Sequence, residues 1–112
     1  MDFPADAIQD AGYQLGKVQQ DKEPDDWKPI ASVGPGVREI RIFERTGAYR
    51  VLYVVKIKGL VHVLHCFHKT TEQTSQRDID KGRTAYREVE AAIAAARVTK
   101  KTTKGRRRKN EV

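Results

Sequence analysis

The sequence predicts an α+β domain with an N-terminal amphipathic helix, a three-stranded antiparallel β-meander and a C-terminal helix. Two observations support this prediction. Apolar residues recur at helical spacing near both ends of residues 1–96, and three runs rich in Val, Ile, Tyr and Phe lie between these regions. A basic segment, residues 97–112, follows this single domain and is expected to be disordered, because it has almost no apolar side chains to bury.

The first helix is expected over residues 4–20, where an apolar stripe is formed by Ile8, Ala11, Leu15 and Val18. Residues 21–36 contain three prolines and two glycines around Trp27, which is typical of a loop. The three strands are expected at residues 37–44, 48–58 and 60–67, with turns at Thr46-Gly47 and around Gly59. The second helix is expected to begin near Asp78, three residues after the capping residue Ser75, and to end near Ala96.

The net charge of +7 is placed unevenly, because residues 97–112 hold eight Lys and Arg against one Glu and therefore carry the whole excess. Residues 1–96 sum to zero, so a cationic site in the domain must be a local cluster. The single cysteine excludes an internal disulfide, and no apolar run approaches the roughly 20 residues of a membrane span. With no secretory signal at the first residues, the expected location is the cytoplasm.

Cationic side chains are predicted to meet on one face of the sheet. The first hairpin is expected to pair Arg50 with Phe43 and Leu52 with Arg41, which places the two arginines on the same face. For the second hairpin two registers are open, and they bring either Lys69 or His68 beside Arg50. Such cations with an aromatic residue could hold a phosphate and stack a base. The competing interpretation is that they are ordinary solvated strand residues.

The three histidines do not predict a metal site. His65 faces away from His62 and His68 in an extended strand, and those two lie roughly 20 Å apart at about 3.3 Å per residue. Cys66 lies in a run typical of a buried strand with no base beside it, so a cysteine nucleophile is not expected. We therefore expect neither a metal nor another cofactor.

Four blocks of sequence resemble the phage-associated, HigB-like branch of the RelE/ParE toxin superfamily, in the family's order and spacing over about residues 3–90. They are residues 26–30 (DWKPI), 33–41 (VGPGVREIR), 48–53 (AYRVLY) and 63–71 (VLHCFHKTT), the last followed by Thr74, Arg77, Asp78 and Ile79. The chain departs from the family pattern at His68, where Lys is usual, at Ser75, where Pro is usual, and at Gly82, where Ala is usual. It also begins without the family's first strand, which either leaves a sheet edge open or means that the start codon has been assigned too late.

The resemblance implies a type II toxin that cleaves ribosome-associated mRNA without a metal and is silenced by a helix-turn-helix antitoxin protein. In that chemistry the ribose 2′-OH attacks the adjacent phosphate, and fixed cations stabilise the charge that builds on its oxygens. Arg50 is the first candidate for this role, Lys69 and Arg41 support it, and His68 is a candidate acid or base. The expected RNA contacts are Phe43, Arg83, Tyr86, Arg106, Arg107 and Arg108, although helical spacing also puts Tyr86 on the packing stripe.

Two other classes of function compete with this one. The same fold could be a catalytically inactive relic, or could bind RNA, the ribosome or DNA gyrase without cutting RNA. A phage protein with only a structural role is the third possibility. The presence of both Arg50 and Lys69 favours the nuclease, whereas the absent first strand favours the relic.

Overall fold

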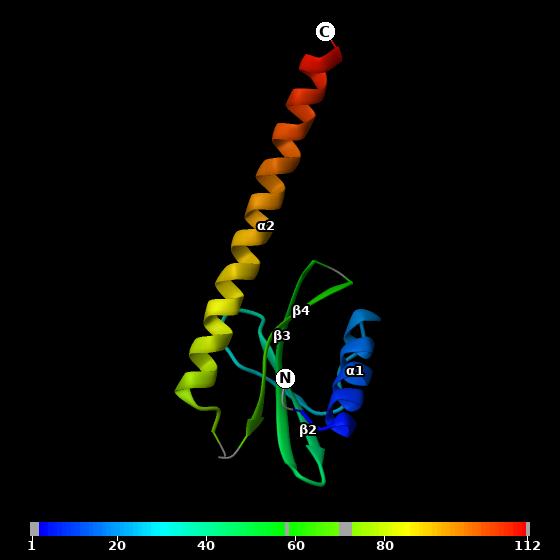
Figure 1. Cartoon of the computed structure of the whole chain (residues 1–112), viewed down its shortest axis with the longest axis vertical. Helices are drawn as coiled ribbons and strands as arrows, with labels where there is room; N and C mark the ends of the chain where they lie inside the picture. The colour runs from blue at the N-terminus through cyan, green and yellow to red at the C-terminus, as the bar shows by residue number, and fades with distance from the viewer. Residues whose placement is uncertain (1–2, 58, 70–72, 112) are drawn as a thin grey trace.

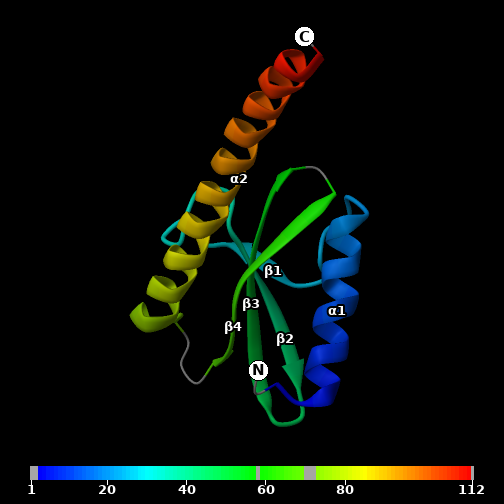
Figure 2. The same cartoon turned by 45° about the horizontal axis from the view of Figure 1, so that its top comes forward.

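The computed structural model of the chain describes residues 3–57, 59–69 and 73–111, with side chains up to residue 97. Its elements are α1 (Ala5–Gln19), β1 (Trp27–Pro29), β2 (Arg38–Glu44), β3 (Gly47–Ile57), β4 (Leu60–Lys69) and α2 (Gln76–Glu111). The strands form one antiparallel sheet in the order β1-β2-β3-β4, and the two helices lie on either side of it (Figures 1 and 2). The predicted α+β class, with one helix before the sheet and one after it, is confirmed.

The sheet has one strand more than the sequence predicted. β1 lies in the segment interpreted as a loop and pairs with β2 through Trp27 opposite Ile40 and Pro29 opposite Arg38. Proline has no backbone N–H and cannot donate a hydrogen bond to a neighbouring strand, so it occurs at the edges of sheets. β1 is an edge strand of three residues.

The strand register decides which side chains share a face. Arg41 lies opposite Arg50, two residues away from the predicted pairing, because the β2–β3 turn contains only Arg45 and Thr46. A shift of two residues keeps every side chain on its face, so the prediction that both arginines point the same way is confirmed. Between β3 and β4, Phe67 lies opposite Arg50, which is the register that brings Lys69 rather than His68 to the face of Arg50.

Each face of the sheet has its own apolar core. On the face covered by α1, hereafter the α1 face, the buried cluster consists of Phe3, Ala7, Val18, Ile40, Ile42, Tyr49, Val51 and Tyr53. On the opposite face, the α2 face, it consists of Ile30, Val33, Val37, Leu52, Val54, Leu64, Phe67 and Tyr86. The alternation of side chains along β3 produces both clusters from one strand.

Helix α2 begins as predicted and ends later than predicted. Its first turn is capped by Ser75, whose Oγ accepts from the backbone N–H of Asp78 at 3.2 Å and donates to the Asp78 carboxylate at 2.7 Å. The helix continues past Ala96 to Glu111 and extends beyond the sheet (Figure 1).

In this structure the segment after Ala96, for which disorder was expected, continues as a helix to Glu111. The segment contains no proline and is rich in Lys and Arg, which are good helix formers, and extending an existing helix requires no new nucleus. Over the residues that the structure describes, no helix is both long enough and apolar enough to cross a bilayer.

Candidate functional site

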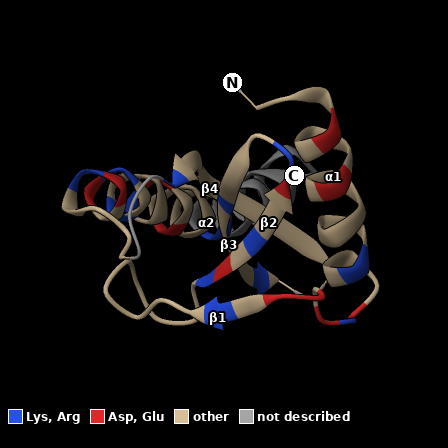
Figure 3. Cartoon of the chain, turned by 90° about the horizontal axis from the view of Figure 1, so that it is seen from below, with Lys and Arg blue, Asp and Glu red and all other residues tan. Residues whose placement is uncertain are grey.

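The α2 face changes from apolar to charged near the β2–β3 turn. There the side chains of Lys28, Arg41, Arg50 and Lys69 come together from β1, β2, β3 and β4, and these four are named the cationic cluster. Figure 3 views the chain from this end and shows Lys and Arg segments on β1 and β2 beside acidic ones. The predicted convergence of Arg41, Arg50 and Lys69 on one region of the sheet agrees with this arrangement.

A buried carboxylate lies at the centre of the cationic cluster. Glu39 has no exposed surface, and its Oε1 lies 3.4 Å from Arg50 Nε and 3.7 Å from Lys28 Nζ. The hydroxyl of Thr74 donates to Oε2 at 2.7 Å. A buried charge without such partners would cost several kcal/mol, so Glu39 and the two cations stabilise one another.

Glu39, Lys28 and Thr74 were not among the predicted site residues. One signal could have found Glu39, since it stands two residues before Arg41 in a strand and therefore shares its face. No comparable signal exists for Lys28, which lies in the segment that was interpreted as a loop, or for Thr74, which follows the last strand.

Arg50 is the most buried cation of the cluster, with 6% of its surface exposed. Its Nη1 donates to the backbone carbonyl of Tyr49 at 3.1 Å, and its Cζ lies 5.5 Å from the centre of the Phe43 ring. Burial lowers the pKa of the guanidinium, although Glu39 opposes this effect. Arginine remains protonated at physiological pH nonetheless, so the site holds a permanent positive charge. Because Phe43 is 64% exposed, an open aromatic surface lies directly beside this charge.

Lys69 is half-buried at the edge of the cluster. Burial lowers the pKa of its ammonium group, the Glu39 carboxylate raises it, and Arg50, Lys28 and Arg41 lower it further. An anion bound here would relieve the repulsion among these cations. The arrangement is therefore suited to hold a phosphate.

Arg41 is held in place by the loop that precedes β1. Its Nε lies 3.3 Å from Asp26 Oδ1, and its backbone N–H donates to the Asp26 carbonyl at 2.8 Å. Asp26 thus fixes both the backbone and the side chain of Arg41, and its position depends on how the loop itself is anchored.

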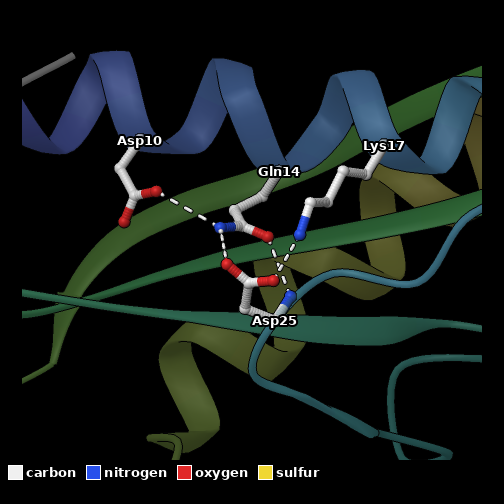
Figure 4. Close-up of polar contacts among 4 residues, drawn as sticks. All are labelled: Asp10, Gln14, Lys17 and Asp25. Carbon is white, nitrogen blue, oxygen red and sulfur yellow. Dashed lines mark hydrogen bonds and ion pairs between the residues drawn. The ribbon is translucent and has the colours of Figure 1, made fainter.

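The anchor of this loop is Asp25, which is bonded to helix α1 (Figure 4). The Asp25 backbone N–H donates to Gln14 Oε1 at 2.8 Å, and the Gln14 amide donates to Asp25 Oδ2 at 2.9 Å. Lys17 forms an ion pair with the same carboxylate, and the hydrogen bonds from Lys17 and Gln14 lower the pKa of Asp25. Helix α1 therefore positions one cation of the cluster from the other side of the sheet.

Two of the predicted site residues lie elsewhere. His68 is on the α1 face, where its ring stacks on Tyr49 at 4.8 Å, because the observed register turns it away from Arg50. Tyr86 is buried in the core, and its ring is so close to Gly34 that a Cβ there would approach it to 2.9 Å. The Tyr86 hydroxyl donates to the Pro35 carbonyl at 3.2 Å and accepts from Lys56 at 2.5 Å, so Tyr86 serves packing.

The remaining predicted RNA contacts lie on α2. Arg83 is exposed, and its Nε donates to the Ser32 carbonyl at 2.6 Å, which ties the helix to the loop before β2. Arg83 Nη1 also lies 3.8 Å from Asp80 Oδ1. Neither contact places Arg83 in the cationic cluster. The side chains of Arg106, Arg107 and Arg108 lie outside the part of the chain that the structure describes.

The described residues contain no group of three or more His, Cys, Asp or Glu that could hold a metal ion. His65 is bonded to Asp78 at 2.8 Å instead, which joins β4 to the first turn of α2. Burial raises the pKa of the Cys66 thiol, which disfavours the thiolate needed for nucleophilic attack.

The chain was compared with known proteins and with protein families. Searches of curated proteins and of solved structures each gave no match. The family model described as phage-derived protein Gp49-like matches residues 1–87, a span that includes α1, the whole sheet, the first part of α2 and every residue of the cationic cluster. Because the match covers most of the sequence, the chain belongs to the phage-derived Gp49-like protein family.

Proposed function

We propose that this protein is a toxin of the RelE/ParE type that cleaves mRNA, as its resemblance to the HigB-like branch implies. The observation that carries the proposal is the meeting of Arg41, Arg50 and Lys69 beside the exposed ring of Phe43 on one open part of the sheet. Three cations and an aromatic surface match the two parts of a nucleotide, its phosphate and its base. Membership of a phage-derived family supports the same assignment.

The reaction follows from the chemistry of RNA. The ribose 2′-oxygen loses its proton to solvent and attacks the adjacent phosphorus, which forms a 2′,3′-cyclic phosphate and releases the 5′-oxygen of the next nucleotide. Arg50 and Arg41 stabilise the negative charge on the phosphoryl oxygens. Lys69 donates the proton that the leaving oxygen needs, because its lowered pKa makes it a stronger acid than an ordinary lysine. Lys69 thus takes the acid role for which His68 was the sequence-based candidate.

Binding without cleavage is the second candidate function, and the burial of Arg50 favours it. With 6% of its surface exposed and Glu39 beside it, Arg50 has little surface to offer to a phosphate. In that case Arg41, Lys69 and Phe43 would bind RNA, the ribosome or DNA gyrase, and Arg50 would serve only to compensate Glu39.

One experiment separates the two candidates. The full chain is expressed from an inducible promoter, growth is followed, and the ends of cellular RNA are mapped. The nuclease proposal expects growth arrest and new RNA ends that carry 2′,3′-cyclic phosphate, and it expects the purified protein with intact ribosomes to produce the same ends. RNA or ribosome binding without any new ends would establish the second candidate, and a supercoiling assay with purified gyrase would test that target.

The proposed partner is a helix-turn-helix antitoxin, and the proposed place of action is the cytoplasm, where mRNA is translated. The cationic cluster and the open edge of β4 are both surfaces that such a partner could cover. Co-expression with the helix-turn-helix protein encoded beside the toxin should restore growth and give a complex that co-purifies. Two proteins that never associate, under conditions where the toxin arrests growth, would exclude this partner.

A further inference from the structure

An apolar groove lies at the end of the sheet opposite to the cationic cluster. It has a volume of about 600 Å³ and runs between the middle of α2 and the β3–β4 hairpin. The register places the hairpin residues Ile57 and Leu60 at one end of β3 and β4, and Ala48 and Lys69 at the other. The groove is therefore separate from the proposed RNA site.

The walls of the groove have the spacing that accommodates a helix. On α2 the lining residues Ala85, Val89, Ala92 and Ala96 recur every three or four positions and extend over roughly 17 Å. On the hairpin the groove is lined by Leu60 and Val63, which remain 46% and 47% exposed. A second apolar helix of about three turns would bury both walls by ordinary helix packing.

A polar group inside the groove is also without a partner. Nε2 of His62, one of the lining residues, is buried and has no hydrogen-bond partner among the residues that the structure describes. A buried polar atom of this kind costs free energy until it is bonded. A polar side chain of a partner would satisfy it after a shift of the side chains that cover it.

The charge along α2 indicates the chemistry of the partner. The groove lining contains one acidic residue, Glu88, and one basic residue, Arg97, and the same helix continues to Glu111 through a segment whose sequence contains seven further Lys and Arg and one Glu. A second copy of this chain packed parallel in the groove would bring a second segment of the same sign beside the first, and the two would repel. A helix with acidic residues beside its apolar stripe would be attracted instead.

We propose that this groove binds an acidic amphipathic helix of a partner protein. The apolar stripe of that helix fills the groove, and its acidic residues lie along the basic end of α2. The identification of this helix with a segment of the antitoxin rests on the proposed function, whereas the groove and its preference for acidic helices do not.

The test uses the full chain and two labelled synthetic helical peptides, each about four turns long, with the same leucine stripe. One carries Glu and the other Lys at the positions that flank the stripe, and binding is measured by fluorescence anisotropy at low and high salt. The acidic peptide should bind at least about tenfold more tightly at low salt, and the difference should shrink at high salt because added ions screen the attraction. Replacement of Arg106, Arg107 and Arg108 by Gln should reduce the preference for the acidic peptide while retaining the apolar contribution.

Two variants test whether the peptide occupies the groove. Ala92→Trp fills the groove from α2, and Leu60→Ser removes an apolar contact from the hairpin wall. The matched control is Ala91→Trp, because Ala91 is exposed and does not line the groove. Affinity should fall by about tenfold or more with Ala92→Trp and by a smaller factor with Leu60→Ser, and it should stay unchanged in the control. Circular dichroism confirms that each variant is folded.

Three outcomes would overturn the proposal. The first is equal binding of the acidic and basic peptides, or no binding of either. The second is binding that both groove variants leave unchanged. The third is a dimer of the free chain, seen by sedimentation, that Ala92→Trp converts to a monomer, since a second copy would then be the occupant. Failure of the proposed function remains distinguishable, because an Arg50→Ala variant that has lost RNA cleavage should still bind the acidic peptide.

Discussion

The two faces of the sheet are made by the same strands, and they differ in what they bury. On the α1 face the buried positions of β2 and the first half of β3 are apolar, as Ile40, Ile42 and Val51 show. On the α2 face Leu52 and Val54 of β3 are apolar, whereas Glu39, Arg41 and Arg50 of the same two strands are charged. The contrast indicates that the side chains on the α1 face form a core, whereas the α2 face is divided between a core under α2 and a charged site beyond it.

The largest effect expected from this contrast is the loss of toxicity in Arg50→Ala. Removal of a donor that stabilises an oxyanion commonly costs about 10² to 10³ in rate, and growth arrest should disappear with it. The measurement is the rate of RNA cleavage by purified protein, together with growth on induction.

Two control variants test whether the loss of cleavage is specific to the cationic cluster. Arg45→Ala removes an exposed cation from the β2–β3 turn, and Ile42→Val trims the core of the α1 face at a cost of about 1 kcal/mol. Both should retain cleavage. If Arg50→Ala is folded by circular dichroism and still cleaves at the wild-type rate, Arg50 has no catalytic part, and the division of the α2 face is wrong.

The second prediction concerns the buried charge of Glu39. Its removal should change the free energy of unfolding in a way that can be measured apart from RNA cleavage. Glu39→Gln leaves Arg50 without its carboxylate and should lower the free energy of unfolding by about 3 kcal/mol, measured by urea denaturation. The double variant Glu39→Gln with Arg50→Met removes both charges and should recover most of that stability without recovering cleavage. A double variant as unstable as Glu39→Gln would contradict the view that the two side chains compensate each other.

The third prediction uses pH to test the attachment of α2 to the sheet. Burial raises the pKa of Asp78, but the hydrogen bonds from Ser75 and His65 outweigh it and leave this pKa below its ordinary value. The stabilisation from Asp78 should therefore be present above the ordinary pKa and be lost as the pH falls through the lowered one.

Asp78→Asn should accordingly destabilise the protein by about 1 kcal/mol near neutral pH and have little effect in acid. Denaturation curves at the two pH values measure this difference. Asp80→Asn, an exposed change two residues along the same helix, is the control and should have little effect at either pH. A loss from Asp78→Asn that persists unchanged in acid would mean that its charge does not hold α2 to β4.

Local patterns in the sequence predicted most of the fold. Helical spacing identified α1 and the start of α2, and strand composition identified β2, β3 and β4. The patterns failed for β1, because three residues that include a proline carry no periodic signal. They also failed for the end of α2, where helix-forming residues extend the helix beyond the last side chains that pack on the sheet.

The site was predicted only in part, for a physical reason. Alternation along single strands was sufficient to place Arg41 and Arg50 on one face, and one of the two open registers brought Lys69 beside Arg50. The other members of the site, such as Lys28 and Thr74, come from other elements and contact Glu39. A local sequence pattern does not predict which elements contact each other. His68 and Tyr86 show the same limit, since their residue types suit RNA chemistry while register and packing place them elsewhere.

The smallest effect is expected from the basic end of α2, which lies beyond both faces of the sheet. Residues 99–111 contain Lys and Arg and no apolar residue, so their expected use is nonspecific attraction to RNA, which weakens with salt as counterions return. Replacement of Arg106, Arg107 and Arg108 by Gln should lower the salt dependence of RNA binding by roughly 2 in the log–log slope, at about 0.7 per cation for single strands. The cleavage rate at saturating RNA should stay the same, because the cationic cluster is intact.

Replacement of the same residues by Lys keeps the charge and should keep the slope. Filter binding across a salt series measures both variants, and a Gln variant with the wild-type slope would mean that this part of α2 does not contact RNA.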